Sequence, residues 1–199
     1  MSGTFPSSPE ANTAQKRSLR QTLVSISHSL KRQTRTRGAQ RWGFSLSWEI
    51  LTRAQISPID AFVESQRGQL GAFQIVIPGF STSQGSWAGS PLVDGASQTG
   101  NTLNVKGLTA GQTGIVKAGD MFSVSGHAKV YMAVADANST AGGLAAISIE
   151  PKLITSPADN EALTTTAVPF TCALAGDLAE VPVRSPSLYS YSLEIIEDA

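Results

Sequence analysis

The chain has 199 residues, a hydrophobic fraction of 41%, and fifteen Lys and Arg residues balanced by fifteen Asp and Glu. No apolar run approaches the roughly 18 residues that a membrane span requires, so we expect no membrane insertion. The first residues lack a basic start followed by an apolar stretch, so we expect synthesis in a cytoplasm rather than secretion.

The N-terminal third contains a polar segment and then two alternating segments. Residues 1–20 are rich in Ser, Pro, Asn, Thr and Gln, which predicts a flexible N-terminal arm. From Leu23, apolar side chains alternate with serines as far as Leu30, a pattern typical of a half-buried strand. A second alternation places five apolar side chains on one face, namely Trp42, Phe44, Leu46, Trp48 and Ile50.

The segment between these two strands is basic and contains Gly38, which tolerates the positive φ of a turn. Residues 23–50 are therefore predicted to form a long antiparallel hairpin with a basic tip. The cations of this tip are Lys31, Arg32, Arg35, Arg37 and Arg41.

A helix follows, although two positions resemble its N-terminal cap, Thr52 and Ser57. The helix is firmest over 58–67, where Phe62 belongs to the apolar stripe and Gly68 fits the left-handed position after the last turn. Residues 72–77 then read as a buried strand that ends before Pro78 and Gly79.

The remainder is irregular over 80–101, with Trp87 as its one large side chain, and then shows short strands separated by turn signals. The fold class expected is mainly β with one helix, as an antiparallel β-sandwich or barrel with a long protruding hairpin. Residues 21–199 are expected to form a single β-rich domain after the N-terminal arm.

Chemical motifs are absent from this sequence. His28 continues the predicted strand face and His127 sits in a turn, so neither suggests a catalytic or metal site. Asp120, Asp136 and Glu150 match no ligand loop and are expected to be solvated turn residues. The single Cys172 excludes an internal disulfide, and its apolar neighbours favour a buried thiol. We therefore expect no enzyme activity, no cofactor and no metal.

Charge is distributed unevenly along the chain. Residues 1–53 carry nine Lys and Arg against two Asp and Glu, whereas residues 54–199 carry six against thirteen. This polarity favours head-to-tail packing of identical subunits, with nucleic acid as an alternative partner and a solvated hairpin without any partner as a third interpretation. Lack of aromatic residues among the tip cations favours protein over DNA. The acidic partners expected on a neighbouring copy are Asp120, Asp136, Asp159, Glu161, Asp177 and Glu180.

Two stretches together resemble a known family. The first stretch is residues 37–78, RGAQRWGFSLSWEILTRAQISPIDAFVESQRGQLGAFQIVIP. It contains, in this order, an aromatic strand, a helix that ends in a [QR]-x-G turn and a Phe-bearing strand. Residues 114–163, beginning GIVKAGDMFSVSGHAK, contain an AGD turn, a strand, a Gly-bearing turn and a strand that closes on Pro. In this order the motifs are similar to distal tail and tail-tip proteins of long-tailed bacteriophages.

The resemblance implies a structural protein of the virion tail, assembled in the bacterial host cytoplasm. It implies a ring, commonly hexameric, that joins the tail tube to the tip, with tube, hub and receptor-binding proteins as partners and DNA only as passing cargo. Trp42 and Phe44 would anchor the aromatic strand, Gln66, Arg67 and Gly68 would end the helix, and Gly119 and Asp120 would shape the later hairpin. A tail-tube subunit is the close alternative. A carbohydrate-binding module is a further one, and it requires Trp87, Tyr189 and Tyr191 on an exposed platform.

Overall fold

The computed structural model describes residues 3–177, 181–184 and 188–199, except the side chains of residues 37 and 184. It divides into two compact units. The barrel unit contains Phe73–Thr171 with the first ten residues, and the hairpin unit contains Ala11–Ala72 with Cys172–Ala199. The fold is mostly antiparallel β, as predicted, with a nearly closed barrel and a half-barrel. The single β-rich domain expected over 21–199 stays a prediction.

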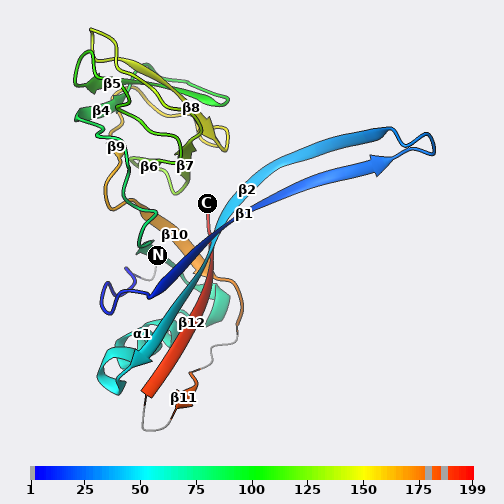
Figure 1. Cartoon of the computed structure of the whole chain (residues 1–199), viewed down its shortest axis with the longest axis vertical. Coiled ribbons are helices and arrows are strands. Elements are labelled where there is room, and N and C mark those ends of the chain that lie inside the picture. The colour runs from blue at the N-terminus through cyan, green and yellow to red at the C-terminus, as the bar shows by residue number, and fades with distance from the viewer. Residues whose placement is uncertain (1–2, 178–180, 185–187) are drawn as a thin grey trace. The chain divides into compact units, whose positions relative to one another are not determined.

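The barrel unit is built from six short antiparallel strands (Figure 1). Their sheet order is β4-β5-β8-β7-β6-β9. An antiparallel bridge from Leu92 to Ala162 connects the two ends of the sheet. The strands are β4 (Gly89–Val93), β5 (Thr102–Leu108), β6 (Met121–Val124), β7 (Val130–Ala133), β8 (Ala145–Glu150) and β9 (Leu163–Thr164).

Alternation of buried and exposed side chains along the strands produces the core of the barrel unit. In β5 and β8 every second side chain is buried, including Leu103, Val105, Ile147 and Ile149. Phe122 lies between Trp87 and Tyr131, with ring centroids 5.4 and 6.1 Å away. Trp87 therefore belongs to the core of the barrel unit.

Asp120 is a buried carboxylate and not a solvated turn residue as expected. Its oxygens accept hydrogen bonds from the backbone N–H groups of Gln84 at 2.6 Å and Lys117 at 2.9 Å, and from Trp87 Nε1 at 2.8 Å. Gly85 also donates, at 3.1 Å. The network joins the turn before β6 to the irregular segment before β4, which is how Asp120 shapes this region. Asp136 and Glu150, by contrast, lie outside the core.

Replacing Asp120 with Ala should destabilise the protein by about 3–5 kcal/mol, because several buried donors would lose their acceptor at once. Asp136→Ala is the matched control: its carboxylate is exposed and pairs with Lys117 at 2.8 Å, so its loss should cost at most about 1 kcal/mol. Urea denaturation would measure both changes. Equal losses for the two variants would contradict the structural role of Asp120.

The hairpin unit is a half-barrel around two long strands, β1 (Thr13–Ile26) and β2 (Arg32–Leu51). Strand β12 (Leu188–Glu197) pairs with β2, and the end of β10 (Pro169–Leu174) pairs with β12. The order of these strands in the sheet is β1-β2-β12-β10, and the short β11 (Val183–Arg184) pairs with β12. Strand β3 spans Ala72–Val76. Cys172 is buried, as its neighbours predicted.

Helix α1 (Arg53–Ser65) precedes a short 3-10 turn at Gly68–Leu70. The helix begins after Thr52, whose backbone N–H donates to Gln55 Oε1 at 2.9 Å, so the first of the two candidate caps is used. Buried Ile56, Ile59 and Val63 form its apolar stripe, while Phe62 is half-buried. No helix in the described part of the chain is long and apolar enough to cross a membrane.

The helix ends in a tight turn that the sequence located correctly at residues 66–68. Gln66 is buried, Arg67 has a φ of 57° and Gly68 a φ of 67°. A Cβ on Gly68 would lie 2.5 Å from Asp177 Oδ1, so a larger residue would displace that side chain as well as strain the backbone. Asp177 in turn accepts the backbone N–H of Gln69 at 3.0 Å.

The aromatic face of β2 forms the core of the hairpin unit. Trp42, Phe44 and Trp48 are each 2% exposed, and the Trp48 ring lies 6.0 Å from the ring of Tyr191. Ile50 does not share this face, because its φ of 58° interrupts the alternation where the register with β12 shifts. Its side chain is 73% exposed, which corrects the prediction.

Two other sequence expectations differ from the structure. Residues 13–20 are not a flexible arm, because they pair with β2 from Thr13↔Ser47 onward. The strand predicted from Leu23 to Leu30 ends at Ile26, and its side chains are exposed rather than half-buried. In both places a distant strand, and not local composition, determines the structure.

Trp48→Ala should cost about 3–5 kcal/mol, because it removes a fully buried aromatic side chain and leaves a cavity. Ile50→Ala on the same strand is the control, since an exposed β-branched residue with positive φ contributes little to stability. Thermal and denaturant unfolding would report both. If Trp48→Ala melts like the parent yet fails to assemble, this face belongs to an interface instead.

Candidate intersubunit interface

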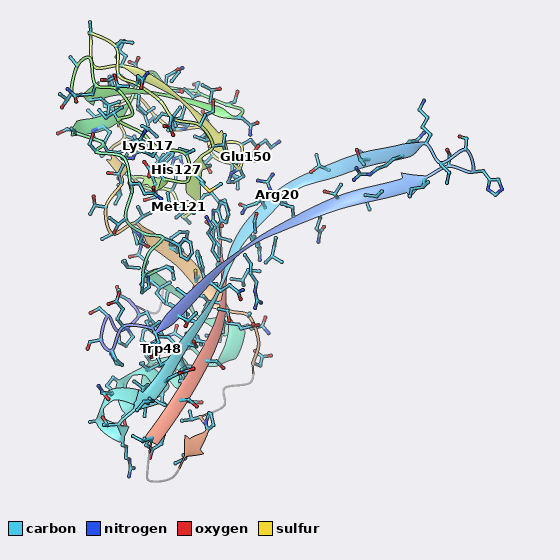
Figure 2. All side chains as sticks on the ribbon, in the orientation of Figure 1. Arg20, Trp48, Lys117, Met121, His127 and Glu150 are labelled. Carbon is cyan, nitrogen blue, oxygen red and sulfur yellow. The ribbon has the colours of Figure 1, made fainter. Side chains whose placement is uncertain are left out.

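The distal half of the β1–β2 hairpin has no covering layer. Pairing of β2 with β12 stops at Gly43↔Ile196, and the ribbon then continues beyond the other strands of its unit (Figure 1). We call residues 19–39 the hairpin extension. Every side chain described in this range is exposed. Figure 2 shows side chains on both sides of this ribbon, beyond the other strands of the hairpin unit.

Within the described residues, the backbone pairing of the hairpin extension is between its own two strands. Its register runs from Leu19↔Arg41 to Ile26↔Arg32. The strands reverse over residues 27–31, where the Ser27 N–H donates to the Lys31 carbonyl at 3.0 Å. Both His28 and Leu30 lie at this tip, and Leu30 is 84% exposed. His28 is therefore not the half-buried residue expected.

Gly38 forms a bulge and not the end of the hairpin, which corrects the sequence prediction. Between Arg20↔Gln40 and Thr22↔Thr36, residues 37–39 of β2 lie opposite one residue of β1. Gly38 adopts a φ of 77° there, and its N–H donates to Thr36 Oγ1 at 3.1 Å. A bulge of this kind bends the ribbon and increases its twist. The positive φ was predicted correctly, but its place in the topology was not.

The predicted interface cations gather on this extension and at its base. Lys31, Arg32 and Arg35 are exposed on it, and exposed Arg41 follows directly on β2. The side chain of Arg37 lies outside what the structure describes. Residues 19–39 contain no Asp or Glu. The cations therefore lie on the extended strand β2 and its junction with the tip, rather than in a compact basic loop.

Apolar side chains accompany the charge. Leu23, Val24 and Ile26 are between 50 and 63% exposed. An isolated two-stranded ribbon with exposed apolar residues and unpaired edges is marginally stable in water, and it is a template for pairing with another chain. These properties make the hairpin extension the candidate interface of this chain.

The acidic residues expected to receive these cations are only partly available. Asp120 is buried, which removes it from the set. Glu161 lies 3.3 Å from His127 Nε2. Lys106 lowers the pKa of Asp159 through a hydrogen bond of 2.6 Å, and Lys117 lowers that of Asp136 in the same way. Asp177 faces the turn after α1, and Glu180 lies outside the described residues.

The described residues show no arrangement typical of catalysis or metal binding. They contain no group of three or more His, Cys, Asp and Glu that could hold a metal ion. The aromatic platform of the carbohydrate-binding alternative is not formed, because Trp87 and Tyr191 are 4 and 2% exposed.

Comparison with known families bears on the barrel unit. Residues 81–168 match the family model described as distal tail protein pb9, B domain. This is a bacteriophage tail family. The second of the two stretches that resembled tail proteins lies inside the matched segment, so the resemblance is confirmed there. No curated protein matches the chain at a significant level.

The match supports a structural role in a phage tail, and hence a place in the virion tail. It suggests a non-enzymatic protein that assembles with other tail components. The hairpin extension lies outside the matched segment, so its role rests on its own geometry. The signal that could have located it in the sequence is the run of residues 11–48, which contains eight Lys and Arg and no acid.

Proposed function

We propose that this protein is the ring subunit at the distal end of a phage tail, joining the tail tube to the tip and receptor-binding apparatus. The observation that carries the proposal is the hairpin extension, an uncovered ribbon on a chain whose barrel unit matches a distal tail family. The extension pairs with an adjacent copy. The same contact, repeated around the tail channel, closes the ring.

The physical argument begins with the exposed edges and faces of the extension. Beyond Trp42 neither edge of the ribbon has a neighbouring strand in the described part of the chain. Pairing with a neighbour satisfies the backbone groups of an edge and removes Leu23, Val24 and Ile26 from water. Because the hairpin extension carries cations and no Asp or Glu, it favours an acidic surface as its partner and disfavours contact with another basic extension.

Directionality favours a head-to-tail assembly over a symmetric dimer. The N-terminal part of the chain is basic and the remainder is acidic, so the basic part of one copy is attracted to the acidic part of the next. Such a head-to-tail contact between different surfaces generates a closed ring when the rotation that relates neighbouring copies adds up to a full turn. The same contact with a helical rise would generate a tube, so a tail-tube subunit remains the alternative. The ring is a hexamer in this proposal, with tube, hub and receptor-binding proteins as its neighbours and DNA only passing through.

The purified protein should form a closed ring whose mass is a fixed multiple of the 20.8 kDa chain. Assembly should weaken as salt rises, because exposed ion pairs contribute at most about 1 kcal/mol each and are screened. Native mass spectrometry at several ionic strengths would measure both. An open-ended polymer would indicate the tube, and a strict monomer at high concentration and low salt would refute the proposal.

Arg32→Glu with Arg35→Glu should prevent ring formation and leave the monomer folded, since both residues are exposed on the extension. The control is Arg53→Glu with Lys152→Glu, which makes the same charge change at exposed sites outside the extension. Sedimentation velocity would report assembly, and circular dichroism the fold. A normal ring from the first variant would exclude the extension as the interface.

A further inference from the structure

We propose that an acidic groove beside α1 is the receptor for this extension, and that it binds basic side chains of the hairpin extension of an adjacent copy. This deepens the ring proposal and rests on it. The groove belongs entirely to the hairpin unit, between the turn that follows α1 and the strands β10 and β12. The occupant that we propose is a second copy of this chain.

The groove has a volume of about 350 Å³, enough for the end of a long side chain and part of a strand. Three carboxylates line it, from Glu64, Asp177 and Glu194. Val63, Leu174 and Tyr191 contribute apolar walls, against which the methylene stem of an arginine or lysine can pack. A site with acidic groups over an apolar wall fits a long cationic side chain better than a free inorganic cation.

The hydroxyl of Tyr191 is the second feature that points to a ligand. This residue is 2% exposed and lines the groove, yet its hydroxyl has no hydrogen-bond partner among the described residues. Burial, together with the negative charges of Asp60 and Glu64, raises the pKa of Tyr191 to about 12. The phenol is therefore neutral and can accept a hydrogen bond from a guanidinium or ammonium group.

The three carboxylates of the groove differ in the ion pairs and hydrogen bonds that they form with described residues. Glu194 pairs with Arg17 at 3.1 Å, although both side chains are half-exposed, so this pair is weak and exchangeable. Asp177 accepts a backbone N–H with Oδ1. Glu64 is exposed and forms no ion pair with any residue that the structure describes. Negative charge therefore remains for an incoming cation.

The chain's own extension cannot fill the groove. Glu194 pairs with Ser45 of β2, whereas Arg35 lies ten residues farther along the same strand. At about 3.3 Å per residue, this separates Arg35 from the groove by roughly 30 Å along a continuous ribbon. Only a second copy can bring Lys31, Arg32 or Arg35 there.

The test uses charge reversal on both sides of the contact in the full chain. Glu64→Lys should raise the protein concentration required for half-assembly by about tenfold, because it replaces an attraction with a repulsion. Adding Arg32→Glu or Arg35→Glu to Glu64→Lys should recover most of that loss, as expected for residues in direct contact. Glu49→Lys is the matched control, an exposed carboxylate of the same unit that does not line the groove.

Each result of this experiment has a defined meaning. If the parent forms rings and Glu64→Lys assembles as well as Glu49→Lys, the groove is not the receptor, although the ring proposal stands. If Glu64→Lys fails to assemble and neither arginine reversal recovers it, the groove binds some other partner and the inference is wrong. A parent that stays monomeric overturns both proposals. Circular dichroism of each monomer separates failed assembly from failed folding.

Discussion

A two-stranded antiparallel ribbon cannot cover its own faces, and this constraint determines how the hairpin unit is organised. Where β12 runs beside β2, the aromatic face of Trp42, Phe44 and Trp48 is buried and the sheet is stable. The third strand ends at Gly43, and over residues 19–39 the same two strands continue with all of their described side chains in water. One hairpin therefore serves as core at its base and as a candidate interface at its end.

The barrel unit contains long irregular connections around a small sheet, and side-chain hydrogen bonds hold them in place. Asp120 does so by accepting hydrogen bonds from Gln84, Gly85, Trp87 and Lys117. Concentrating several donors on one buried carboxylate compensates the cost of removing its charge from water. The matched family covers this unit, whereas the hairpin extension lies outside the match. The chain thus combines a barrel unit that matches a distal tail family with an exposed extension that lies outside the matched residues.

Several local features could be predicted because neighbouring residues determine them. The alternation from Trp42 to Trp48 and the positive φ at Gly68 follow from side-chain polarity and from the absence of a Cβ, respectively. The helix start remained open because two similar caps precede it, and the bond between Thr52 and Gln55 decides between them. The basic character of the candidate interface could be predicted from composition, whereas its extended shape could not.

By itself, the sequence determined the mainly antiparallel β class, the aromatic core strand and the resemblance to phage tail proteins, because these depend on local pattern and motif order. Tertiary structure alone decided that Leu23, Val24 and Ile26 lie in water, since an alternating pattern reports polarity but not whether a covering layer exists. It also decided that Asp120 is buried, because the donors that stabilise its charge lie up to 36 residues away along the chain. Long-range pairing of this kind leaves no trace in the residues that surround it.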